Sequence, residues 1–371
     1  MKVRMGLVGL GNIGREHLRY LLSMDDVELA ALCDVDEAKA NLYAERHGIP
    51  AFYTHIEMME KAELDAVIVA VPHYDHGPIA IDAFQKGIHV LCEKPITVHV
   101  NLAQKIIGAY EEAKKTYPGL LFAMMFQERT RPHAKKIKDL LESGELGRLT
   151  RVTWINTAWF RSQAYYDSGD WRATWAGEGG GILTNQCPHD LDMYHWFFGL
   201  PRRINGFAHI GKFHDIEVED EVTAYMEHED GMISHFIVTT GECPGENRME
   251  IVGENGTLVY QAQKITFYRN RRSMLKFSRM ATEGFAKLEN WECEIPIDFS
   301  EPSGHQVVTE RFVRSIIRGD SNLVASGTEG LNPVMMANAI MLSSFEDKTI
   351  FLPIDGDAFE EKLNELIALS V

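Results

Sequence analysis

The sequence predicts two domains: an α/β domain built on a doubly wound parallel sheet, and an α+β domain with a large, mostly antiparallel open sheet. Up to about residue 125, short and continuously apolar segments alternate with helical patterns, as strands covered on both faces do. From about residue 146, strand-like segments joined by turns follow one another. The 371 residues also exceed the usual size of one domain. We therefore expect the domains to comprise residues 1–125 and 126–371.

The elements of the first domain are expected in the order strand, helix, strand that produces parallel pairing. Asp65–Val71 is an almost unbroken apolar run that ends at Pro72, which is typical of a buried strand. The other predicted strands span 3–9, 28–33, 89–92 and 120–125, and the predicted helices span 13–24, 76–86 and 98–115.

The second domain is expected to contain five to seven strands arranged as hairpins. Asp230-Gly231 and Asn255-Gly256 are dipeptides that favour two-residue turns, because both central positions need positive φ. The predicted strands span 148–160, 203–212, 218–228, 232–240, 248–253, 257–261 and 264–269, and the predicted helices span 188–198, 304–319 and 329–345.

Composition excludes several classes of partner. The formal net charge of −17 opposes binding to nucleic acid or to an anionic membrane surface, because both need a basic face. The sequence lacks an apolar run of about 18 residues, the length that a membrane span needs. Its opening segment resembles a strand more than a signal peptide, so we expect a cytoplasmic protein. The five cysteines are scattered and form no C-x-x-C pair, which argues against a disulfide framework.

The segment Gly9–Gly14 reads Gly-Leu-Gly-Asn-Ile-Gly and lies between a predicted strand and a predicted helix. In this context the pattern is typical of a Rossmann domain, with the glycines allowing close approach of a pyrophosphate to the helix N-terminus. Asp34 follows the second strand and can accept hydrogen bonds from a ribose. Its charge would repel a 2′-phosphate, which favours NAD over NADP. The alternative for Asp34 is a carboxylate that only forms a turn.

Five segments together resemble the Gfo/Idh/MocA family, which contains glucose–fructose oxidoreductases and inositol dehydrogenases. They cover most of the chain in the family's order: Pro72–His76, Val90–Pro95, the linker Phe126–Pro132 with Gly144–Gly147, Gly179–Gly181 followed by His189 and Asp192, and His305–Gly319. The resemblance implies an enzyme that acts on a small carbohydrate and forms a homo-oligomer, a dimer or tetramer, through the open sheet. With the glycine motif, it also implies the cofactor-binding residues Gly9, Gly11, Asn12, Ile13, Gly14, Asp34, Val71, Pro72, His73, His76, Glu93 and Lys94.

Oxidation of an alcohol by NAD transfers a hydride to the nicotinamide and needs a base for the hydroxyl proton. By the family's precedent, Lys94 and His189 are the expected catalytic pair. A histidine titrates near neutral pH, and a lysine can hold the substrate oxygen. The alternatives are a solvated loop lysine and a histidine that caps or packs near the start of a helix.

One position departs from the family pattern. Asn185 stands where many members carry an aspartate four residues before the histidine, and we expect its amide to bind a substrate hydroxyl. The stretch from Trp154 to Trp175 forms an aromatic run: Trp154, Trp159, Phe160, Tyr165, Tyr166, Trp171 and Trp175. Part of this run is expected to be core, and part to stack on a sugar or an aglycone. The predicted substrate-binding residues are Asn185, Gln127, Arg172 and Tyr166.

Cys187, His189, Asp192 and His195 also suggest a metal site. His189 and Asp192 share a helix face, as do Asp192 and His195, but His189 and His195 do not, so we expect no metal. The leading interpretation is an NAD-dependent dehydrogenase of a sugar, cyclitol or glycoside, with C3 of a glycoside as a candidate position. A second is an enzyme that keeps NAD bound and recycles it, either between two substrates or during oxidation-assisted cleavage of a glycosidic bond. A third, from another class, is a non-catalytic sensor of NAD or sugar.

Overall fold

A computed structural model describes residues 2–370, which form two compact units. Unit 1 contains the residues up to Thr130, Gly177–Gly179 and Pro302–Val334. Unit 2 contains Arg131–Ala176, Gly180–Glu301 and the residues from Met335 onwards. The chain first leaves unit 1 after Thr130, whereas the expected second domain begins at residue 126, and the return of residues 302–334 to unit 1 was not expected from the sequence. Within residues 2–370, every helix is too short or too polar to cross a membrane.

Unit 1 is built on a six-stranded parallel sheet, which confirms the doubly wound arrangement expected from the sequence. The strand order is β3-β2-β1-β4-β5-β6. It reverses between β1 and β4, the switch point at which doubly wound sheets bind ligands. The strands are β1 (Val3–Val8), β2 (Val27–Cys33), β3 (Ala51–Phe52), β4 (Ala66–Val69), β5 (His89–Cys92) and β6 (Phe122–Met124).

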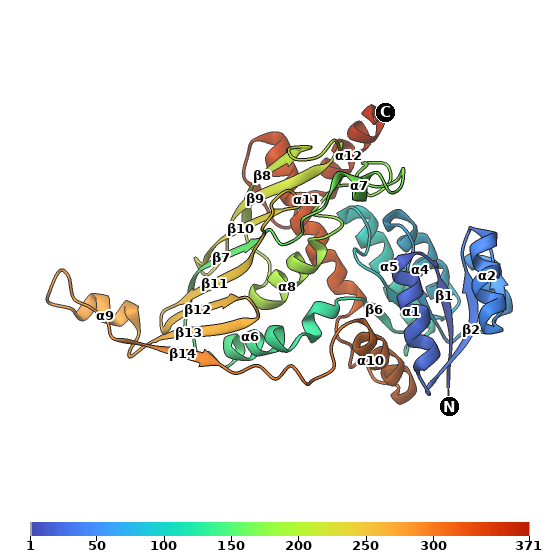
Figure 1. Cartoon of the computed structure of the whole chain (residues 1–371), viewed down its shortest axis with the longest axis horizontal. Helices are drawn as coiled ribbons and strands as arrows, with labels where there is room; N and C mark the ends of the chain where they lie inside the picture. Colours follow the sequence, from blue (N-terminus) through green and yellow to red (C-terminus); the bar gives the residue numbers. More distant parts are fainter. Residues whose placement is uncertain (1, 371) are drawn as a thin grey trace. The chain divides into compact units, whose positions relative to one another are not determined.

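Helices cover this sheet (Figure 1). They are α1 (Asn12–Ser23), α2 (Glu37–His47), α3 (His55–Lys61), α4 (His76–Gln85), α5 (Val100–Thr116) and α10 (His305–Arg318), with 3-10 turns η1 (His73–Asp75), η2 (Gln127–Thr130) and η3 (Gly327–Gly330). Local signals set their ends: α2 begins where Asp36 accepts from the backbone of Lys39 and ends at Gly48, whose φ is 68°. Leu7, Leu18 and Phe312, from β1, α1 and α10, lie in one core.

Unit 2 is built on a nine-stranded sheet in the order β14-β13-β12-β11-β7-β10-β9-β8-β15. In the described chain its strands pair antiparallel except for β7 with β10, so the mostly antiparallel prediction is confirmed. The strands are β7 (Leu149–Asn156), β8 (Arg203–Ile210), β9 (Glu219–Glu227), β10 (Ile233–Thr239), β11 (Asn247–Gly253), β12 (Gly256–Gln261), β13 (Lys264–Asn270), β14 (Asn290–Ile295) and β15 (Ile350–Phe351).

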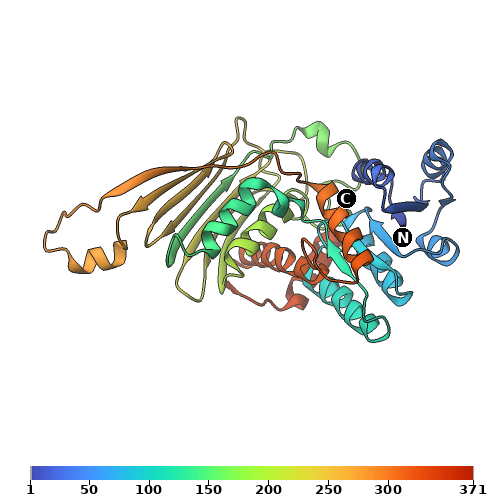
Figure 2. The ribbon, with the colours of Figure 1, turned by 90° about the horizontal axis from the view of Figure 1, so that it is seen from below.

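Burial alternates along β9, β10 and β11, so one face of this sheet is covered and the other is partly exposed. Figures 1 and 2 show α6 (Pro132–Glu142) and α8 (Pro188–Phe198) on the covered face. Tyr194 of α8 donates to Ser234 of β10 at 2.5 Å, and His133 of α6 stacks on Tyr260 of β12 at 4.7 Å. The other helices are α7 (Gln163–Tyr166), α9 (Met274–Met280), α11 (Leu331–Glu346), which continues from unit 1, and α12 (Gly356–Leu369).

Two sequence predictions about this sheet were wrong. The sheet has nine strands rather than five to seven, because it also includes two edge strands, the mostly exposed β14 and the two-residue β15. The hairpin turns also differ from the expected ones: the first is longer than two residues, and the second has two residues but is shifted by one position. At the first, the backbone N–H of His228 donates to Met232 at 2.9 Å, which leaves a three-residue loop that includes Asp230 and Gly231. At the second, Gly253 pairs with Gly256, so Asn255 is central but Gly256 is not.

Candidate functional site

The carboxyl ends of four parallel strands lie in one row of unit 1. Val8 pairs with Val69, Val69 with Cys92, and Cys92 with Met124. The residues that follow these strands therefore reach the same edge of the sheet, which is where this architecture binds its ligands. This edge collects the predicted cofactor-binding residues that follow β1, β4 and β5, and Gln127, which is buried in η2 after β6.

Gly9, Gly11 and Gly14 in the first turn each lack a side chain for a different physical reason. A Cβ on Gly9, whose φ is +94°, would lie 2.1 Å from the Ala70 carbonyl, and a Cβ on Gly14 would lie 2.0 Å from the Gly9 carbonyl. Packing therefore requires glycine at both positions. A Cβ on Gly11 would meet no atom within 4 Å, so this position faces open space at the start of α1. No side chain caps this helix and its first turn carries no acidic residue, so its N–H groups suit an anion. The turn thus fits the pyrophosphate of NAD.

Asp34 holds the same turn together. Its carboxylate accepts from the backbone N–H of Leu10 at 2.8 Å and of Asp36 at 2.9 Å, and Lys39 Nζ lies 3.4 Å away. The two interpretations of Asp34 from the sequence were a ribose-binding carboxylate and a carboxylate that only forms a turn. The contacts are compatible with both, because this turn-forming carboxylate lies at the end of β2, beside the glycine turn. Its contact with a ribose stays a prediction.

The loop that carries Lys94 is fixed by two buried histidines. His17 Nε2 lies 2.8 Å from Glu93 Oε1, which ties the loop after β5 to α1. Burial would raise the pKa of Glu93, but the hydrogen bond and charge of His17, together with the charges of His305 and Lys94, outweigh it and lower this pKa to about 2. His76 lies 2.7 Å from the Pro95 carbonyl and 2.9 Å from the Val71 carbonyl. Glu93 is thus a carboxylate at neutral pH, and Lys94 lies between two anchored neighbours.

His73 and Gly179 bring a distant segment to this edge. His73 Nδ1 lies 3.1 Å from the carbonyl of Glu178, and a Cβ on Gly179 would lie 2.5 Å from Val98. The Gly177–Gly179 segment therefore belongs to unit 1 by its contacts.

In unit 2, a buried glutamate positions the segment that carries Asn185. Glu219 of β9 accepts from the backbone N–H of Gly181 at 2.8 Å and of Leu183 at 2.9 Å. The backbone then turns, with the N–H of Asn185 donating to the Gly181 carbonyl at 3.0 Å. Cys187 is the N-cap residue of α8, without a hydrogen bond from its side chain to the helix, and Pro188 occupies the first turn. His189 is the second residue of α8 and is half-buried.

Three donors converge on the hydroxyl oxygen of Tyr165. They come from Arg172 Nη1 at 2.9 Å, Asn185 Nδ2 at 3.3 Å and Gln186 Nε2 at 3.5 Å. The Arg172 guanidinium also lies over the Tyr165 ring, 4.6 Å from its centroid. The structure thus brings together two predicted substrate-binding residues, Asn185 and Arg172, around a tyrosine that the sequence named only as one of several aromatic residues.

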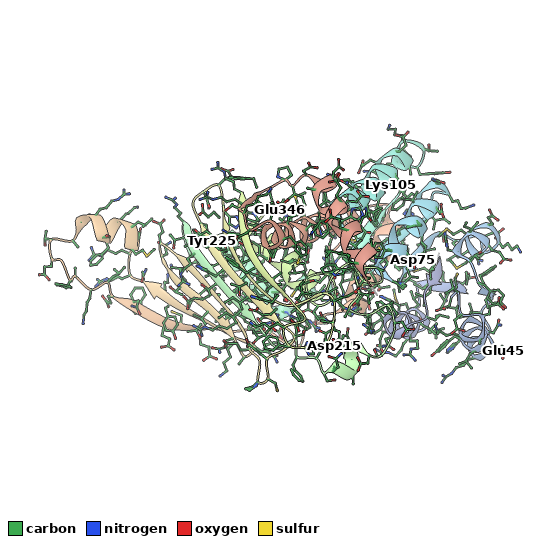
Figure 3. The ribbon with its side chains drawn as sticks, turned by 90° about the horizontal axis from the view of Figure 1, so that it is seen from above. Glu45, Asp75, Lys105, Asp215, Tyr225 and Glu346 are labelled. Carbon is green, nitrogen blue, oxygen red and sulfur yellow. The ribbon has the colours of Figure 1, made fainter. Side chains whose placement is uncertain are left out.

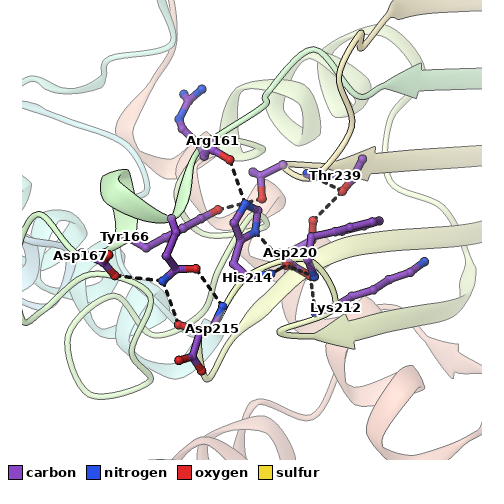
Figure 4. Close-up of polar contacts among 12 residues, drawn as sticks. Arg161, Tyr166, Asp167, Lys212, His214, Asp215, Asp220 and Thr239 are labelled. Carbon is purple, nitrogen blue, oxygen red and sulfur yellow. Dashed lines mark hydrogen bonds and ion pairs between the residues drawn. The ribbon is translucent and has the colours of Figure 1, made fainter.

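Polar contacts from β9 and the loop before it anchor the segment that carries Tyr165 (Figure 4). The Asp220 carboxylate accepts from His214 Nδ1 at 2.9 Å, and His214 Nε2 lies 2.9 Å from the Arg161 carbonyl. Gln163, the first residue of α7, exchanges two hydrogen bonds with the backbone of Asp215, at 2.9 and 3.2 Å. A pocket of about 500 Å³ lies beside this segment, with Arg172 and Asp215 among its lining residues.

Other residues of the aromatic run serve the interior. Trp154 is buried, as expected for a strand residue. Tyr166 is also buried, and its hydroxyl donates to Thr240 at 2.8 Å, so a role for it in substrate binding stays a prediction. Trp159 donates to Asp190 at 2.8 Å, and Trp175 is buried. Tyr165 and Tyr166 lie in the four-residue helix α7, and so short a helix has no sequence pattern that predicts which of the two side chains faces outward.

The metal interpretation finds no support in the geometry. Within residues 2–370, no three His, Cys, Asp or Glu side chains lie close enough together to hold an ion. Asp192 is buried in α8, where the sequence placed it on a face with His189.

The two predicted catalytic residues come from different units: Lys94 belongs to unit 1 and His189 to unit 2.

Two family profiles match this chain. One, described as an oxidoreductase family with an NAD-binding Rossmann fold, matches residues 3–118, and the GFO/IDH/MocA C-terminal domain matches residues 134–259. The rhizopine catabolism protein MocA of Rhizobium meliloti is 30% identical over 53% of this chain and 58% of its own length. An inositol 2-dehydrogenase of Corynebacterium glutamicum is 25% identical over 62% of this chain and 65% of its own. Each alignment covers less than two thirds of the relative.

Solved structures resemble the chain over almost all of its length. The WlbA dehydrogenase from Bordetella pertussis, crystallised with NADH and UDP-GlcNAcA, has a TM-score of 0.78 at 26% identity, covering 96% of this chain and 100% of that one. Levoglucosan dehydrogenase has a TM-score of 0.78 at 18% identity, covering 95% and 100%. At that identity the second likeness concerns the fold alone.

Proposed function

This chain belongs to the Gfo/Idh/MocA family of oxidoreductases and has its NAD-binding Rossmann domain, and on that basis we propose that it oxidises a secondary hydroxyl group of a sugar, cyclitol or glycoside. When bound, NAD supplies the acceptor for the hydride that leaves the alcohol carbon. The relatives that carry the names inositol 2-dehydrogenase and WlbA dehydrogenase support a substrate rich in hydroxyl groups.

The observation that carries this proposal is the cluster around Tyr165. An amide, a guanidinium and a phenol, from Asn185, Arg172 and Tyr165, meet within hydrogen-bond distance on a partly exposed surface. Few but well-placed polar groups beside aromatic rings are typical of sites that read the hydroxyls of a carbohydrate. Trp171, which is exposed and also lies against Arg172, adds an apolar surface for the C–H face of a ring or for an aglycone.

Two further residues take roles in the chemical step under this proposal. His189 accepts the hydroxyl proton, because an imidazole changes its protonation near neutral pH. Lys94 holds the oxygen of the reacting hydroxyl through its ammonium group, and its loop is fixed by the Glu93 and His76 contacts. Asn185 contributes hydrogen bonds but takes no proton, because an amide is not a base at this pH.

The proposal is tested by following NADH formation with a panel of inositols, free sugars, nucleotide sugars and aryl glycosides. With an active substrate, Lys94→Ala and His189→Ala should each lower kcat by about 10²–10⁴. Asn185→Ala should act mainly on KM. Matched controls are Lys105→Ala and His47→Ala, which remove exposed side chains of the same types. A His189→Ala enzyme with near-normal kcat would place the base elsewhere.

Two alternatives give different results in the same assay. An enzyme that retains its cofactor would release NAD or NADH only on denaturation and would turn over only when both substrates, or a cleavable glycoside, are present. A sensor would bind NAD and sugar without turnover. Regiochemistry, including the candidate C3 of a glycoside, follows from the structure of the isolated ketone product.

A further inference from the structure

Two segments of unit 2 that are distant in the sequence form the walls of the pocket beside Tyr165. We call residues 161–174 the Tyr165 segment, and residues 211–218, between β8 and β9, the pocket loop. The lining residues come from both: Tyr166, Asp167, Gly169, Asp170, Arg172, Ala173 and Thr174 from the first, and Asp215, Ile216 and Glu217 from the second. Figure 3 shows Asp215 next to the pale green helix α7. The shape of the pocket therefore depends on contacts that hold the two segments together.

His214 of the pocket loop provides one of these contacts. Its Nε2 lies 2.9 Å from the carbonyl of Arg161, at the start of the Tyr165 segment (Figure 4). Its ring also packs on the ring of Tyr166, with the two centroids 4.8 Å apart. Along the chain, His214 thus contacts the residues on both sides of Tyr165.

The hydrogen bonds of His214 require a positive charge on its ring. Nδ1 lies 2.9 Å from the carboxylate of Asp220, and Nε2 lies 2.9 Å from the carbonyl of Arg161. A carboxylate and a carbonyl only accept hydrogen bonds, so both ring nitrogens must carry a hydrogen. An imidazole with a hydrogen on each nitrogen is an imidazolium.

Asp220 is held as a carboxylate by the backbone of the pocket loop. One of its oxygens accepts from the N–H of Lys212 at 2.9 Å, and the other accepts from the N–H of Phe213 at 2.8 Å and of His214 at 3.0 Å. Such bonds favour the ionised form. The side chains of Asp220 and His214 are 0% and 6% exposed, so this negative charge is buried and needs a positive partner. The imidazolium provides it.

Two acidic groups near His214 do not compete for this role. Burial raises the pKa of Tyr166 to about 12, and its hydroxyl donates to Thr240 at 2.8 Å, so the phenol stays neutral. Asp215, the next residue of the pocket loop, is exposed, where solvent screens its charge.

The cationic side chains close to His214 in the chain have other partners. The ammonium group of Lys212 pairs with Glu221 at 3.0 Å. The guanidinium group of Arg161 lies over the ring of Tyr165, 5.1 Å from its centroid. The contact between His214 and the Arg161 carbonyl is therefore governed by the protonation of the histidine itself.

We propose that His214 is a positioning residue for substrate binding that acts through its imidazolium form. In this form it donates to Asp220 and Arg161 at once and holds the Tyr165 segment on the pocket loop. When the ring loses a proton, one of these hydrogen bonds is lost, because a neutral imidazole has a single N–H. The Tyr165 segment is then held less firmly, and the substrate binds more weakly at alkaline pH. The part of this inference that concerns substrate rests on the proposed function.

Hydrogen exchange tests the contact without any substrate. His214→Gln keeps an N–H donor but has no charge and no titrating proton, so amides of the Tyr165 segment should exchange about tenfold faster than in the wild type at about pH 6. The ratio of the two rates should fall toward one as the pH rises to about 10, because the wild type then loses the same hydrogen bond. A purely structural defect would leave this ratio constant.

NMR of isotopically labelled histidine nitrogens tests the charge directly. At neutral pH one ring with both nitrogens protonated should be present in the wild type and absent from His214→Gln. This measurement also needs no substrate, so it stands whatever the chain oxidises.

Steady-state kinetics tests the consequence for substrate. His214→Gln should raise KM about tenfold at about pH 6 and leave kcat within about twofold, since His214 does not touch the reacting atoms. The rise of KM with pH in the wild type should disappear in the variant. His55→Gln is the matched control, because His55 pairs with Asp82 at 2.8 Å but belongs to unit 1.

The outcomes separate this inference from the proposed function. A neutral His214 at neutral pH, an exchange ratio that does not change with pH, or an unchanged KM would each overturn the inference. If exchange and NMR behave as expected but the protein neither binds nor oxidises any sugar, cyclitol or glycoside, the proposed function fails, and with it the role of His214 toward substrate.

Discussion

At the scale of single residues, Asn185 and Tyr165 explain how an amide could replace the aspartate found in many family members. Nδ2 of Asn185 donates to the Tyr165 hydroxyl, so the amide has one orientation and its oxygen points along a fixed direction. A hydroxyl group of the substrate would then meet an acceptor, as it would at a carboxylate, but without the negative charge. Arg172, which donates to the same tyrosine, holds the ring in place.

We predict that Tyr165→Phe raises KM for the substrate about 2- to 12-fold, because one hydrogen bond is worth about 0.5–1.5 kcal/mol. A carboxylate has two equivalent oxygens and needs no such orientation. The further change Tyr165→Phe should therefore raise KM much less in an Asn185→Asp enzyme than in the wild type. Steady-state kinetics of the double-mutant cycle measures this coupling. Tyr194→Phe is the control, since it removes a buried hydrogen bond to Ser234 and should lower Tm rather than raise KM.

Sequence alone could predict the residues whose roles depend on the local backbone. Gly14 is an example, since it is required by the carbonyl of Gly9 within the same strand-turn-helix unit, whereas Gly9 is required by the carbonyl of Ala70, which follows β4. It could not predict Glu219, which binds the Gly181–Leu183 backbone across 36 or more residues, or the pairing of His17 with Glu93 across 76. Such contacts depend on which strands and helices become neighbours, and no local pattern records that.

At the scale of elements, the His17–Glu93 pair joins α1 to the end of β5 and makes this junction sensitive to acid. A pKa of Glu93 near 2, below its ordinary value of 4.5, means that the folded state favours the carboxylate. This contribution to stability is complete above pH 4.5 and is lost as the pH falls toward 2.

We predict that Glu93→Gln flattens the dependence of stability on pH between about 4.5 and 2. The variant keeps an acceptor for His17 but has no proton to bind, so it should be less stable than the wild type at pH 6 and should lose less stability on acidification. Urea unfolding at pH 6, 4 and 3 measures the difference. Glu45→Gln on the exposed face of α2 is the control. Parallel curves for Glu93→Gln and the wild type would contradict the assignment.

Strands were predictable from the sequence where their hydrophobic residues followed a clear pattern. Continuous apolar runs gave the parallel strands β1, β4 and β5, and alternation gave β9 and β10. The strand β14 alternates apolar and acidic residues but lies at the edge of the sheet, where neither of its faces is fully buried, and it was missed. The turn at Asp230-Gly231 was assigned the wrong length because loop length depends on strand register.

At the scale of the whole molecule, unit 1 is assembled from separate parts of the chain. Phe312 and Val308 of α10 complete the core of β1 and α1, Arg129 pairs with Glu329 at 2.6 Å, and the N–H of Gly304 donates to Thr130 at 2.7 Å. A Cβ on Gly327 would lie 2.0 Å from the ring of Phe122, so η3 also packs directly on β6.

We predict that residues 1–130 alone do not form a stable NAD-binding domain, whereas the same segment joined by a flexible linker to residues 302–334 does. The missing segment leaves the apolar side of β1 and α1 in water, and loss of Phe312 alone should cost about 3–5 kcal/mol. Thermal unfolding with and without NAD tests this. A cooperative, NAD-stabilised transition in residues 1–130 alone would contradict it.

The return of residues 302–334 to unit 1 has a consequence for the order of events during translation. The strands of the nucleotide-binding sheet leave the ribosome first, yet their core is completed only after the segment for α10 has been made. In the meantime, the nascent chain exposes the apolar surface of β1 and α1 while the strands of unit 2 emerge behind it. An N-terminal domain is usually the first to fold during synthesis, but here it cannot complete its core until residues 302–334 have been made. A message truncated before codon 302 would therefore produce a chain whose nucleotide-binding unit cannot complete its fold.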